Sequence, residues 1–475
     1  MTRGRVAVVG AGWAGLAAAL DALDAGFDVH VLERAPAPGG RARRIGWTLA
    51  DGRAVAVDNG QHILIGAYSE TLALMKRTGV DPQAALLRLP LAIEYPGGPW
   101  LRAPRWPAPL HLLAALASAR GLSWAARASS IGFAARARAS GWRLAKDVTV
   151  ERMLADRGVH AQAVALLWEP LCLAALNTPM QQASAQVFLN VLRDSVGADR
   201  ASSDLLVPKV DLSAVLPDAA WRLLGERGAT LHAPAPVTAV EPSADGFAIR
   251  MTGGRGLAVD AVVLATNFAD AASLLSPLAA ANATVSQTVA RLHALQPSAI
   301  ATAWLALPEG PHWRTPMLAM RCDASRPAQW LFARHLIDPG TRLVAAVISA
   351  QARDHDREAL RQALLAQVGQ AIGQAGGKSS DEIAPSDSPM RIVVERAATF
   401  LCTPGLVRPA TRTGVDGLVL AGDFVDSPYP GTLESAVRSG RAAASELAAR
   451  RARTAPGAQA RLPVQAVDQP VARSA

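Results

Sequence analysis

Three glycines near the start of the chain have the spacing of a phosphate-binding loop. Gly10, Gly12 and Gly15 follow the apolar run 6–9 and open an Ala/Leu-rich helical stretch. Glycines so placed allow a tight turn, a close approach of the backbone to a pyrophosphate, and close packing of a helix whose N-terminus attracts phosphate. Glu33 ends the next apolar run, where a carboxylate can bind a ribose hydroxyl. The segment predicts a dinucleotide site comprising Gly10, Gly12, Trp13, Ala14, Gly15 and Glu33.

A basic segment with a Gly-Gly pair follows this acid. Residues 34–43 read RAPAPGGRAR, and a plain NAD-binding domain has no need of such an element. It resembles the Glu-Arg…Gly-Gly-Arg element of the FAD-dependent amine oxidases and carotenoid desaturases. The resemblance implies that the dinucleotide is FAD and that Arg34, Gly40 and Arg41 lie close to it. The alternative is a basic surface loop.

Two later segments resemble other flavin-contacting elements of the same family. One is DNGQHILIG at 58–66, and the other runs from an apolar strand through Gly422-Asp423 to a helix that opens at Thr432. The resemblance implies that Asp423 lies on the ribitol-phosphate side. The helix N-terminus would then stabilise negative charge on the reduced flavin. The other cofactor-binding residues that it implies are Gly60, Gln61, Val237, Ala265, Gly422, Gly431 and Leu433.

Two side chains are candidates for proton transfer. Glu169 stands in the apolar stretch 167–179, which could line a cavity for a hydrocarbon. A carboxyl group in such surroundings has a raised pKa and can donate a proton, whereas a glutamate at a helix end would be exposed or paired with an arginine. His62 lies in the DNGQH turn, where a histidine is more often a hydrogen-bonding spacer than an acid or base. No metal site is expected, because the three cysteines are far apart.

The elements that must position these residues alternate between strands and helices. Strands are expected at 28–32, 229–232, 260–266, 300–307 and 343–350, with a strand or hairpin at 47–57 and a hairpin over 236–250. Helices are expected at 69–79, 110–139, 152 onward, 183–192, 212–227 and 354–375. This order predicts an α/β protein with a Rossmann-type FAD-binding domain (a GR2-like flavoprotein), an interleaved α+β substrate domain and a helical membrane-facing region. The FAD-binding domain is assigned to 1–70, 205–270 and 396–450, and the substrate-binding domain to 71–204 and 271–395. Residues 451–475 are expected to form a disordered tail.

The net charge of +9 on these 475 residues is unevenly distributed. Segment 95–146 has no Asp or Glu but carries Arg102, Arg105, Arg120, Arg127, Arg136, Arg138, Arg143, Lys146 and the tryptophans Trp100, Trp106, Trp124 and Trp142. Such a composition is typical of a surface that docks on an anionic membrane. The alternative is a solvated basic face over core tryptophans, and nucleic acid is disfavoured by the site chemistry elsewhere.

Several bulk features bear on location. No apolar stretch approaches the roughly 18 to 20 residues that span a bilayer. The first strand begins at once, which leaves no room for a secretory signal, and the few cysteines suit a reducing compartment. A cytoplasmic protein, peripheral on the inner face of the cytoplasmic membrane, is therefore expected.

The middle of the chain favours one branch of the family. DNGQHILIGAY, WEPLCLAALNTP and AGDFVDSPYPGTLESAVRSG together resemble the hydroxysqualene dehydroxylases, the squalene-associated, desaturase-like flavoenzymes of bacterial hopanoid pathways. The resemblance implies an isoprenoid substrate whose allylic hydroxyl is protonated, leaves as water and is replaced by hydride from reduced flavin. The electron donor is unknown. The chain carries a single dinucleotide fingerprint, so electrons must come from a partner, a quinone or transiently bound NADPH.

Three other functions stay open. An oxidative desaturase of phytoene or a related polyene would use the same flavin and a similar tunnel. An amine oxidase is less favoured, because a cationic amine site usually needs an aromatic cage and the chain has three tyrosines. A non-catalytic prenyl-protein escort is disfavoured by the intact flavin elements.

Overall fold

A parallel sheet of five strands carries the amino-terminal glycine loop. Its order is β10 (Thr230–His232), β2 (Asp28–Leu32), β1 (Arg5–Val9), β14 (Ala261–Leu264) and β20 (Leu418–Leu420), and every pairing is parallel. Strand β14 is buried along its whole length, as a run of apolar residues predicts for a strand covered on both faces. Segments far apart in the chain therefore build one sheet, as expected for the Rossmann-type domain. The computed structural model describes residues 4–49, 51–307, 313–323, 325–350, 356–376 and 388–454.

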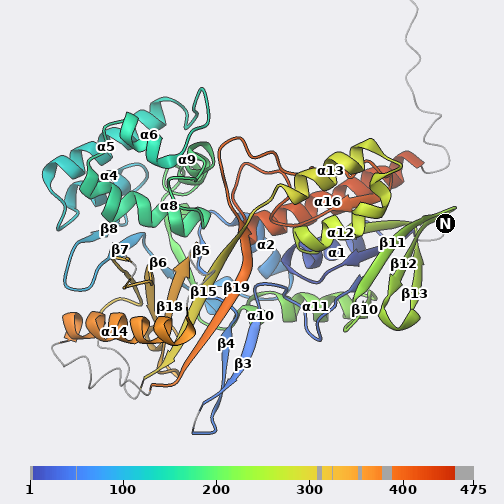
Figure 1. Cartoon of the computed structure of the whole chain (residues 1–475), viewed down its shortest axis with the longest axis horizontal. Helices are drawn as coiled ribbons and strands as arrows, with labels where there is room; N and C mark the ends of the chain where they lie inside the picture. Colours follow the sequence, from blue (N-terminus) through green and yellow to red (C-terminus); the bar gives the residue numbers. More distant parts are fainter. Residues whose placement is uncertain are drawn as a thin grey trace, which may run out of the picture.

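Helices pack tightly on this sheet. Helix α1 (Trp13–Asp24) contacts α16 (Leu433–Thr454) and α11 (Pro217–Glu226). The approach of α16 to α1 requires Gly440, because a Cβ at this position would lie 2.0 Å from the Ala14 carbonyl oxygen. The single helix expected at 212–227 was wrong: α10 (Leu212–Val215) ends before Pro217, which opens α11. The parallel sheet with α1, α11 and α16 is called the parallel-sheet half below, and it lies on the right of Figure 1.

A second sheet of five antiparallel strands lies at the lower left of Figure 1. Its order is β16 (Met317–Ala319), β17 (Trp330–Ala333), β18 (Leu343–Ser349), β15 (Pro297–Ala306) and β19 (Met390–Phe400). Because side chains alternate across a strand, Ala301 and Leu305 face α14 (Arg357–Gly376), whereas Trp304 and Phe332 face the opposite core. The face that carries Trp304 and Phe332 is called the inner face below, and it also holds the buried Thr302.

A cluster of helices lies above that sheet in Figure 1. Its helices are α4 (Leu110–Ser118), α5 (Trp124–Ala139), α6 (Val150–Asp156), α7 (Ala161–Ala163), α8 (Glu169–Leu176) and α9 (Ala185–Asp194). Four of these helices have side-chain N-caps. The hydroxyl oxygens of Ser123, Thr149 and Ser184 accept the backbone N–H three residues on, which confirms the predicted cap at Thr149, and His160 Nδ1 caps α7. These helices and the antiparallel sheet with α14 form the antiparallel-sheet half.

The predicted domain boundaries fall inside elements at four places. Two of them cut helices, after 70 in α2 (Ser69–Arg77) and after 270 in α12 (Phe268–Ala279). Strand β19 crosses the boundary at 396, so the antiparallel sheet continues into the segment assigned to FAD binding. Helix α16 continues past 450 to Thr454, and the rest of the predicted tail lies outside the described residues. Among the residues that the structure describes, each helix is too short or too polar to cross a lipid bilayer.

Candidate active site

The glycine loop lies between β1 and α1 at the carboxyl end of the parallel sheet. Gly10 has φ +105° and donates its N–H to the Leu32 carbonyl at 2.8 Å. Gly12 is the N-cap of α1 and contributes no side chain, so the first amides of the helix have no side-chain acceptor. A Cβ at Gly12 would meet only the Cα of Gly40, at 4.0 Å. The space before the helix start is thus bounded by two glycine backbones, which suits a pyrophosphate.

The Gly-Gly-Arg turn is held over this helix start. Gly39 donates its N–H to the Ala11 carbonyl at 2.9 Å, and Trp13 Nε1 donates to the Ala42 carbonyl at 3.1 Å. The side chain of Trp13 is buried, so this residue serves the loop through packing as well as through its backbone. Ala14 is also buried, beside the crossing with α16.

The two residues expected at the ribose lie in different environments. Glu33 is buried and accepts the N–H groups of Ala11 at 2.7 Å and Ala35 at 2.8 Å, so its carboxylate borders the glycine loop. Arg34 is turned outward, with its side chain 67% exposed, and pairs with Asp270 at 2.9 Å. The structure therefore brings Glu33 to the site but gives Arg34 a partner on the surface. Val237 opens β11 (Val237–Ser243), and the carbonyl of Ala265 borders Gly10.

A partly buried ion pair joins the Gly-Gly-Arg turn to the carboxy-terminal element. Arg41 Nη2 lies 2.5 Å from Asp423 Oδ1, and Arg41 Nη1 donates to the carbonyls of Ala397 at 3.1 Å and Ala398 at 2.6 Å. A Cβ at Gly431 would lie 2.9 Å from Asp423 Oδ2, so the loop before α16 packs directly on this carboxylate. Three segments that are distant in sequence therefore meet at Asp423.

The N-terminus of α16 closes the same region. The Thr432 hydroxyl oxygen accepts the Ser435 N–H at 3.1 Å and caps the helix, while Gly422 donates its N–H to the Ser439 hydroxyl at 3.0 Å. In a capped first turn, the amides of Leu433 and Glu434 have no intrahelical acceptor. They are available to a ligand with negative charge.

The DNGQH turn packs against the inner face of the antiparallel sheet. Gln61 donates its N–H to Thr302 Oγ1 at 3.3 Å, and a Cβ at Gly60 would lie 3.8 Å from the same oxygen. Gln61 Oε1 is buried and has no hydrogen-bond partner among the described residues. Buried acceptors are rarely left unpaired, so this atom fits a bound group that donates a hydrogen bond. The residues present therefore fit a flavin dinucleotide along a path from Gly12 to Gln61.

A hydrogen bond to the backbone fixes the tautomer of the His62 ring. Its Nδ1 lies 2.7 Å from the Gly60 carbonyl, so Nδ1 carries the proton and Nε2 keeps its lone pair. Burial lowers the pKa of His62, and the nearby Arg41 guanidinium lowers it further. A neutral imidazole in this tautomer is suited to accept a proton rather than to donate one.

Glu169 is the first residue of α8 and directly follows a π-helical turn, Val164–Trp168. It is half-buried, and within the described part of the chain its carboxyl group makes no hydrogen bond and no ion pair, so the arginine partner considered from sequence is not found there. Burial raises the pKa of this carboxyl, and the neighbouring Glu151 raises it further. Among the described residues, Glu169 and His62 share no hydrogen bond.

Two residues absent from the sequence-based list contribute to the region. Asp58 Oδ1 accepts the Leu212 N–H at 2.8 Å, and its backbone carbonyl accepts Trp304 Nε1 at 3.0 Å. Burial raises the pKa of Asp58 to about 7. Thr302 binds the Gln61 amide as described above. Asp58 stands in the DNGQH motif and could have been singled out; Thr302 carries no local signal.

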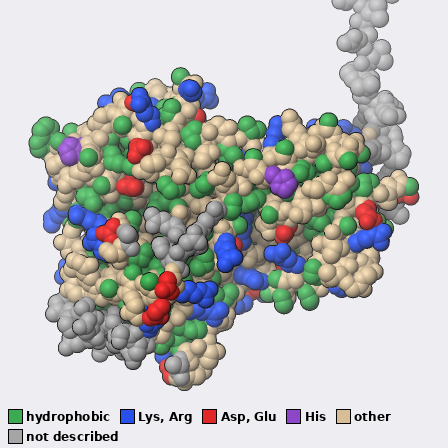
Figure 2. All heavy atoms as spheres, viewed as in Figure 1, with side chains coloured by type: hydrophobic (Ala, Val, Ile, Leu, Met, Phe, Trp, Pro, Cys, Tyr) green, Lys and Arg blue, Asp and Glu red, His purple; other side chains and the backbone are tan. Residues whose placement is uncertain are grey.

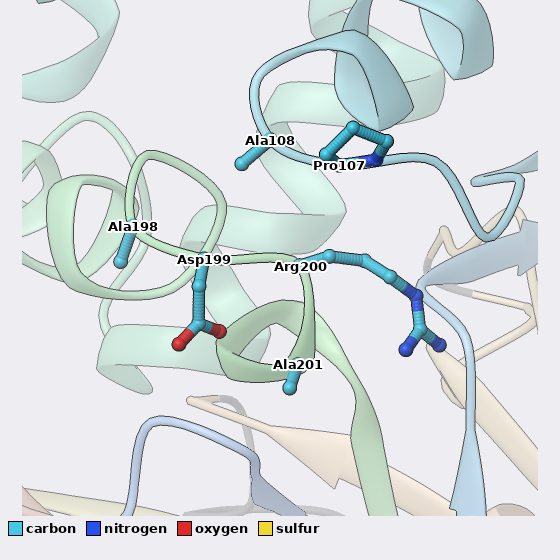
Figure 3. A pocket seen from close by; sticks show the side chains of 6 residues that line it. All are labelled: Pro107, Ala108, Ala198, Asp199, Arg200 and Ala201. Carbon is cyan, nitrogen blue, oxygen red and sulfur yellow. The ribbon is translucent and has the colours of Figure 1, made fainter.

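Two views of the surface help to place the site. Basic side chains gather in the middle of the face shown in Figure 2, above the hairpin of β3 (Arg44–Thr48) and β4 (Ala54–Asp58). Figure 3 shows a separate surface cavity of about 590 Å³, lined by Pro107, Ala108, Ala198, Asp199, Arg200 and Ala201. None of these six residues belongs to the glycine loop, the DNGQH turn or the Asp423 cluster. This cavity is therefore distinct from the cofactor region.

Comparison with known proteins agrees with this geometry. The family described as flavin containing amine oxidoreductase matches residues 13–448. The chain belongs to this family. It is an FAD-dependent oxidoreductase, and FAD is its cofactor.

Individual proteins refine the comparison. The chain is 30% identical to the hydroxysqualene dehydroxylase of Rhodopseudomonas palustris, over 94% of this chain and 99% of that one. It is 28% identical to the hydroxysqualene dehydroxylase of Sinorhizobium fredii, over 92% and 97%. The probable zeta-carotene desaturase of Synechococcus elongatus is 43% identical over 16% of this chain and 15% of its own. A putative protoporphyrinogen oxidase from Exiguobacterium has the same fold, with a TM-score of 0.67 at 17% identity over 94% of this flavoprotein and 99% of that structure.

Proposed function

We propose that this flavoprotein reduces hydroxysqualene to squalene. The observation that carries the proposal is similarity to hydroxysqualene dehydroxylases along nearly the whole chain, both halves included. In the reaction one carbon–oxygen bond breaks, the hydroxyl takes up a proton and leaves as water, and a carbon–hydrogen bond forms. The hydride would come from FAD bound in its reduced form, which would be left oxidised.

The antiparallel-sheet half supplies a wall suited to a hydrocarbon. Trp304, Trp330 and Phe332 lie on the inner face of the sheet and belong to one apolar core with Leu167 and Leu176 of the facing helices. Hydrocarbon surface gains roughly 25 cal/mol per Å² on leaving water. Aromatic faces also stabilise a cation formed when the hydroxyl leaves. The wall would therefore bind the substrate chain and keep water from the carbon that receives hydride.

Glu169 is the proposed proton donor. Its carboxyl group has no donor within hydrogen-bond distance in the described structure and has a raised pKa, so it retains a proton more readily than an exposed glutamate. His62 is proposed to accept a hydrogen bond through Nε2 and so to orient the substrate hydroxyl. For these two roles, both side chains must reach the same substrate hydroxyl.

The cofactor is proposed to lie along the junction of the two halves. The amides of Gly12, Trp13 and Ala14 would bind the pyrophosphate, and Glu33 would bind the adenosine ribose. Further contacts are assigned to Gly10, Gly15, Gly40, Arg41, Gly60, Gln61, Val237, Ala265, Gly422, Asp423, Gly431, Thr432 and Leu433. Arg34 is also assigned to the cofactor, at the outer edge of the site. Its ion pair with Asp270 would have to break for it to contact FAD.

A paired assay tests the proposed function. Purified protein should be yellow; after anaerobic reduction with dithionite it should convert hydroxysqualene to squalene, and the oxidised form should leave phytoene unchanged. Desaturation of phytoene without conversion of hydroxysqualene would establish the polyene desaturase instead, the alternative favoured by the short carotene desaturase match. Protein without flavin absorbance would contradict both enzymes and favour an escort.

We further propose that segment 95–146 docks this flavoprotein on the anionic inner face of the cytoplasmic membrane. Trp106 is 56% exposed, Leu110 51% and Trp124 82%, and these are three of the large exposed apolar side chains among the described residues. Arg102, Arg105 and Arg120 are exposed in the same segment. Trp142, in contrast, is buried and belongs to the core. Burial of an exposed tryptophan in the interface is worth roughly 2 kcal/mol, and each nearby arginine adds about 1 kcal/mol on an anionic surface.

Vesicle binding tests the docking surface. Wild-type protein should sediment with vesicles that contain phosphatidylglycerol and bind pure phosphatidylcholine weakly. Replacing Trp106 and Trp124 together by alanine should weaken binding at least tenfold, whereas Val407→Ala, which removes an exposed side chain outside the segment, should not change it. Equal binding to both vesicle types, or binding to neither, would contradict the proposal.

A further inference from the structure

Glu434 is a buried carboxylate at the cofactor end of α16 that the proposed chemistry does not use. The residue is 5% exposed. Its Oε1 accepts the Glu70 N–H at 3.1 Å and Arg438 Nε at 2.8 Å, while Oε2 accepts the Thr71 N–H at 2.9 Å and the Thr71 hydroxyl at 2.7 Å. All four neighbours are donors, so the group is bound as a carboxylate anion.

Two of those donors are the first amides of another helix. Helix α2 (Ser69–Arg77) begins after Tyr68, which provides no side-chain cap. Glu434 therefore caps α2 from a different helix, by satisfying amides that the first turn leaves free. The N-termini of α2 and α16 are thus fastened to each other at one carboxylate.

The Glu434 carboxylate affects the charge near the proposed flavin position as well as the position of α16. Each helix N-terminus carries about half a positive charge, and Arg438 adds one more. Glu434 is the second residue of the first turn of α16, so its negative charge lies within one turn of the amides that would face the flavin. It offsets much of the positive potential that this helix end would otherwise present.

We propose that Glu434 is a positioning residue that fixes the N-terminus of α16 and keeps the reduction potential of bound FAD low. This inference rests on the proposed function for its purpose, since a reduced flavin of low potential gives up hydride more readily. Positive charge beside the flavin would stabilise the anion of its reduced form and so raise the potential. The carboxylate opposes that effect, while its bonds to α2 hold the helix end in place.

Spectroelectrochemical titration of the FAD-loaded protein without substrate tests the proposal. Glu434→Gln keeps the side-chain size and removes the negative charge, so the midpoint potential should become more positive. Arg438→Gln leaves the carboxylate with one positive partner fewer, so the potential should become more negative. A purely structural role would not produce shifts of opposite sign. Glu70→Gln is the matched control, because its carboxylate pairs with Arg441 at the surface, and it should leave the potential unchanged.

The outcomes separate this inference from the proposed function. Opposite shifts in the two variants support the role of Glu434 even if hydroxysqualene proves not to be the substrate. Conversion of hydroxysqualene by a Glu434→Gln protein of unchanged potential overturns it while leaving the proposed function intact. If Glu434→Gln does not retain FAD, an unchanged or more positive potential in Arg438→Gln overturns the inference.

Discussion

The carboxyl groups that each half contributes to the candidate site are held in opposite ways. In the parallel-sheet half, Glu33 is bound by two backbone amides, Asp423 by the guanidinium of Arg41, and Glu434 by four donors. In the antiparallel-sheet half, Glu169 has no donor within the described residues, and burial raises its pKa. Donors keep a carboxylate ionised, whereas an apolar wall keeps the proton on it. The first arrangement suits a charged cofactor, and the second suits proton donation to a hydrocarbon alcohol.

Asp58 lies at the junction and shares features of both halves. Asp58 is buried like Asp423. Among the described residues, its carboxylate accepts one hydrogen bond, from the backbone amide of Leu212. Arg334 lowers its pKa less than burial raises it. Some of these carboxyl groups accept several hydrogen bonds and others accept few or none, and this contrast can be tested at several positions.

The largest effect is expected at Gly15, where the parallel-sheet half tolerates no added atom. In Gly15→Ala the Cβ would lie 1.9 Å from the Gly10 carbonyl oxygen, so α1 must move away from the loop. We expect complete loss of bound FAD, measured as flavin absorbance per protein. Gly46→Ala, with nothing within 4 Å of the added Cβ, is the control and should keep its flavin. A flavin content equal to wild type in Gly15→Ala would show that the loop is not close-packed.

The next largest effect concerns the pH dependence of stability at Asp58. Its pKa is about 7 in the folded protein against 3.8 ordinarily, so between these values the folded state binds more protons than the unfolded state. The stability contributed by this proton is present below the ordinary pKa and is lost as pH rises through about 7, by on the order of 4 kcal/mol. Asp58→Asn still offers an oxygen to Leu212. We therefore expect this variant to be more stable than wild type at pH 8, in urea unfolding, and little different at pH 4. If wild type and Asp58→Asn were equally stable at pH 8, the ionised Asp58 carboxylate would have to be solvated in the folded protein.

A smaller effect, on turnover, is expected at Glu169. Loss of a general acid lowers a rate by about 100-fold or more, so pre-reduced Glu169→Gln should convert hydroxysqualene at least ~100 times more slowly. Its FAD content should not change. Glu151→Gln removes the neighbouring carboxylate and should keep most of the activity. Undiminished turnover in Glu169→Gln would exclude Glu169 as the proton donor, and undiminished turnover in His62→Ala would exclude the orienting role proposed for His62.

The smallest of these effects is expected at the ion pair of the parallel-sheet half. Asp423→Asn leaves Arg41 with a neutral partner, and a hydrogen bond between charged groups is worth about 2 kcal/mol, so FAD should bind about 30-fold more weakly. Equilibrium dialysis of FAD measures this change. Asp270→Asn breaks the exposed pair with Arg34 and should alter affinity less than threefold. An equal loss of FAD affinity in Asp423→Asn and Asp270→Asn would show that the Arg41–Asp423 pair contributes no more to FAD binding than the Arg34–Asp270 pair.

The sequence by itself determined the features whose partners lie close along the chain. The glycine loop, the cap at Thr149 and the apolar strands could be found there, because a turn or a first helical turn depends on a few neighbouring residues. The acid-free tryptophan segment was also visible in composition. Only the tertiary structure showed that Trp142 is core whereas Trp106 and Trp124 are exposed, since burial depends on which elements pack on each side chain.

The tertiary structure alone decided how the distant segments meet. Strand β19 gave no clear sequence signal, yet it pairs with β15 across about ninety residues of chain, and the carbonyls at Ala397 and Ala398 bind Arg41. Glu434 reads as an ordinary acid in a first helical turn until its carboxylate is seen on the amides of Glu70 and Thr71. Such contacts depend on sheet order and helix crossing, which local residue patterns do not encode. The sequence thus determined what could bind the cofactor, and the fold decided which charges surround it.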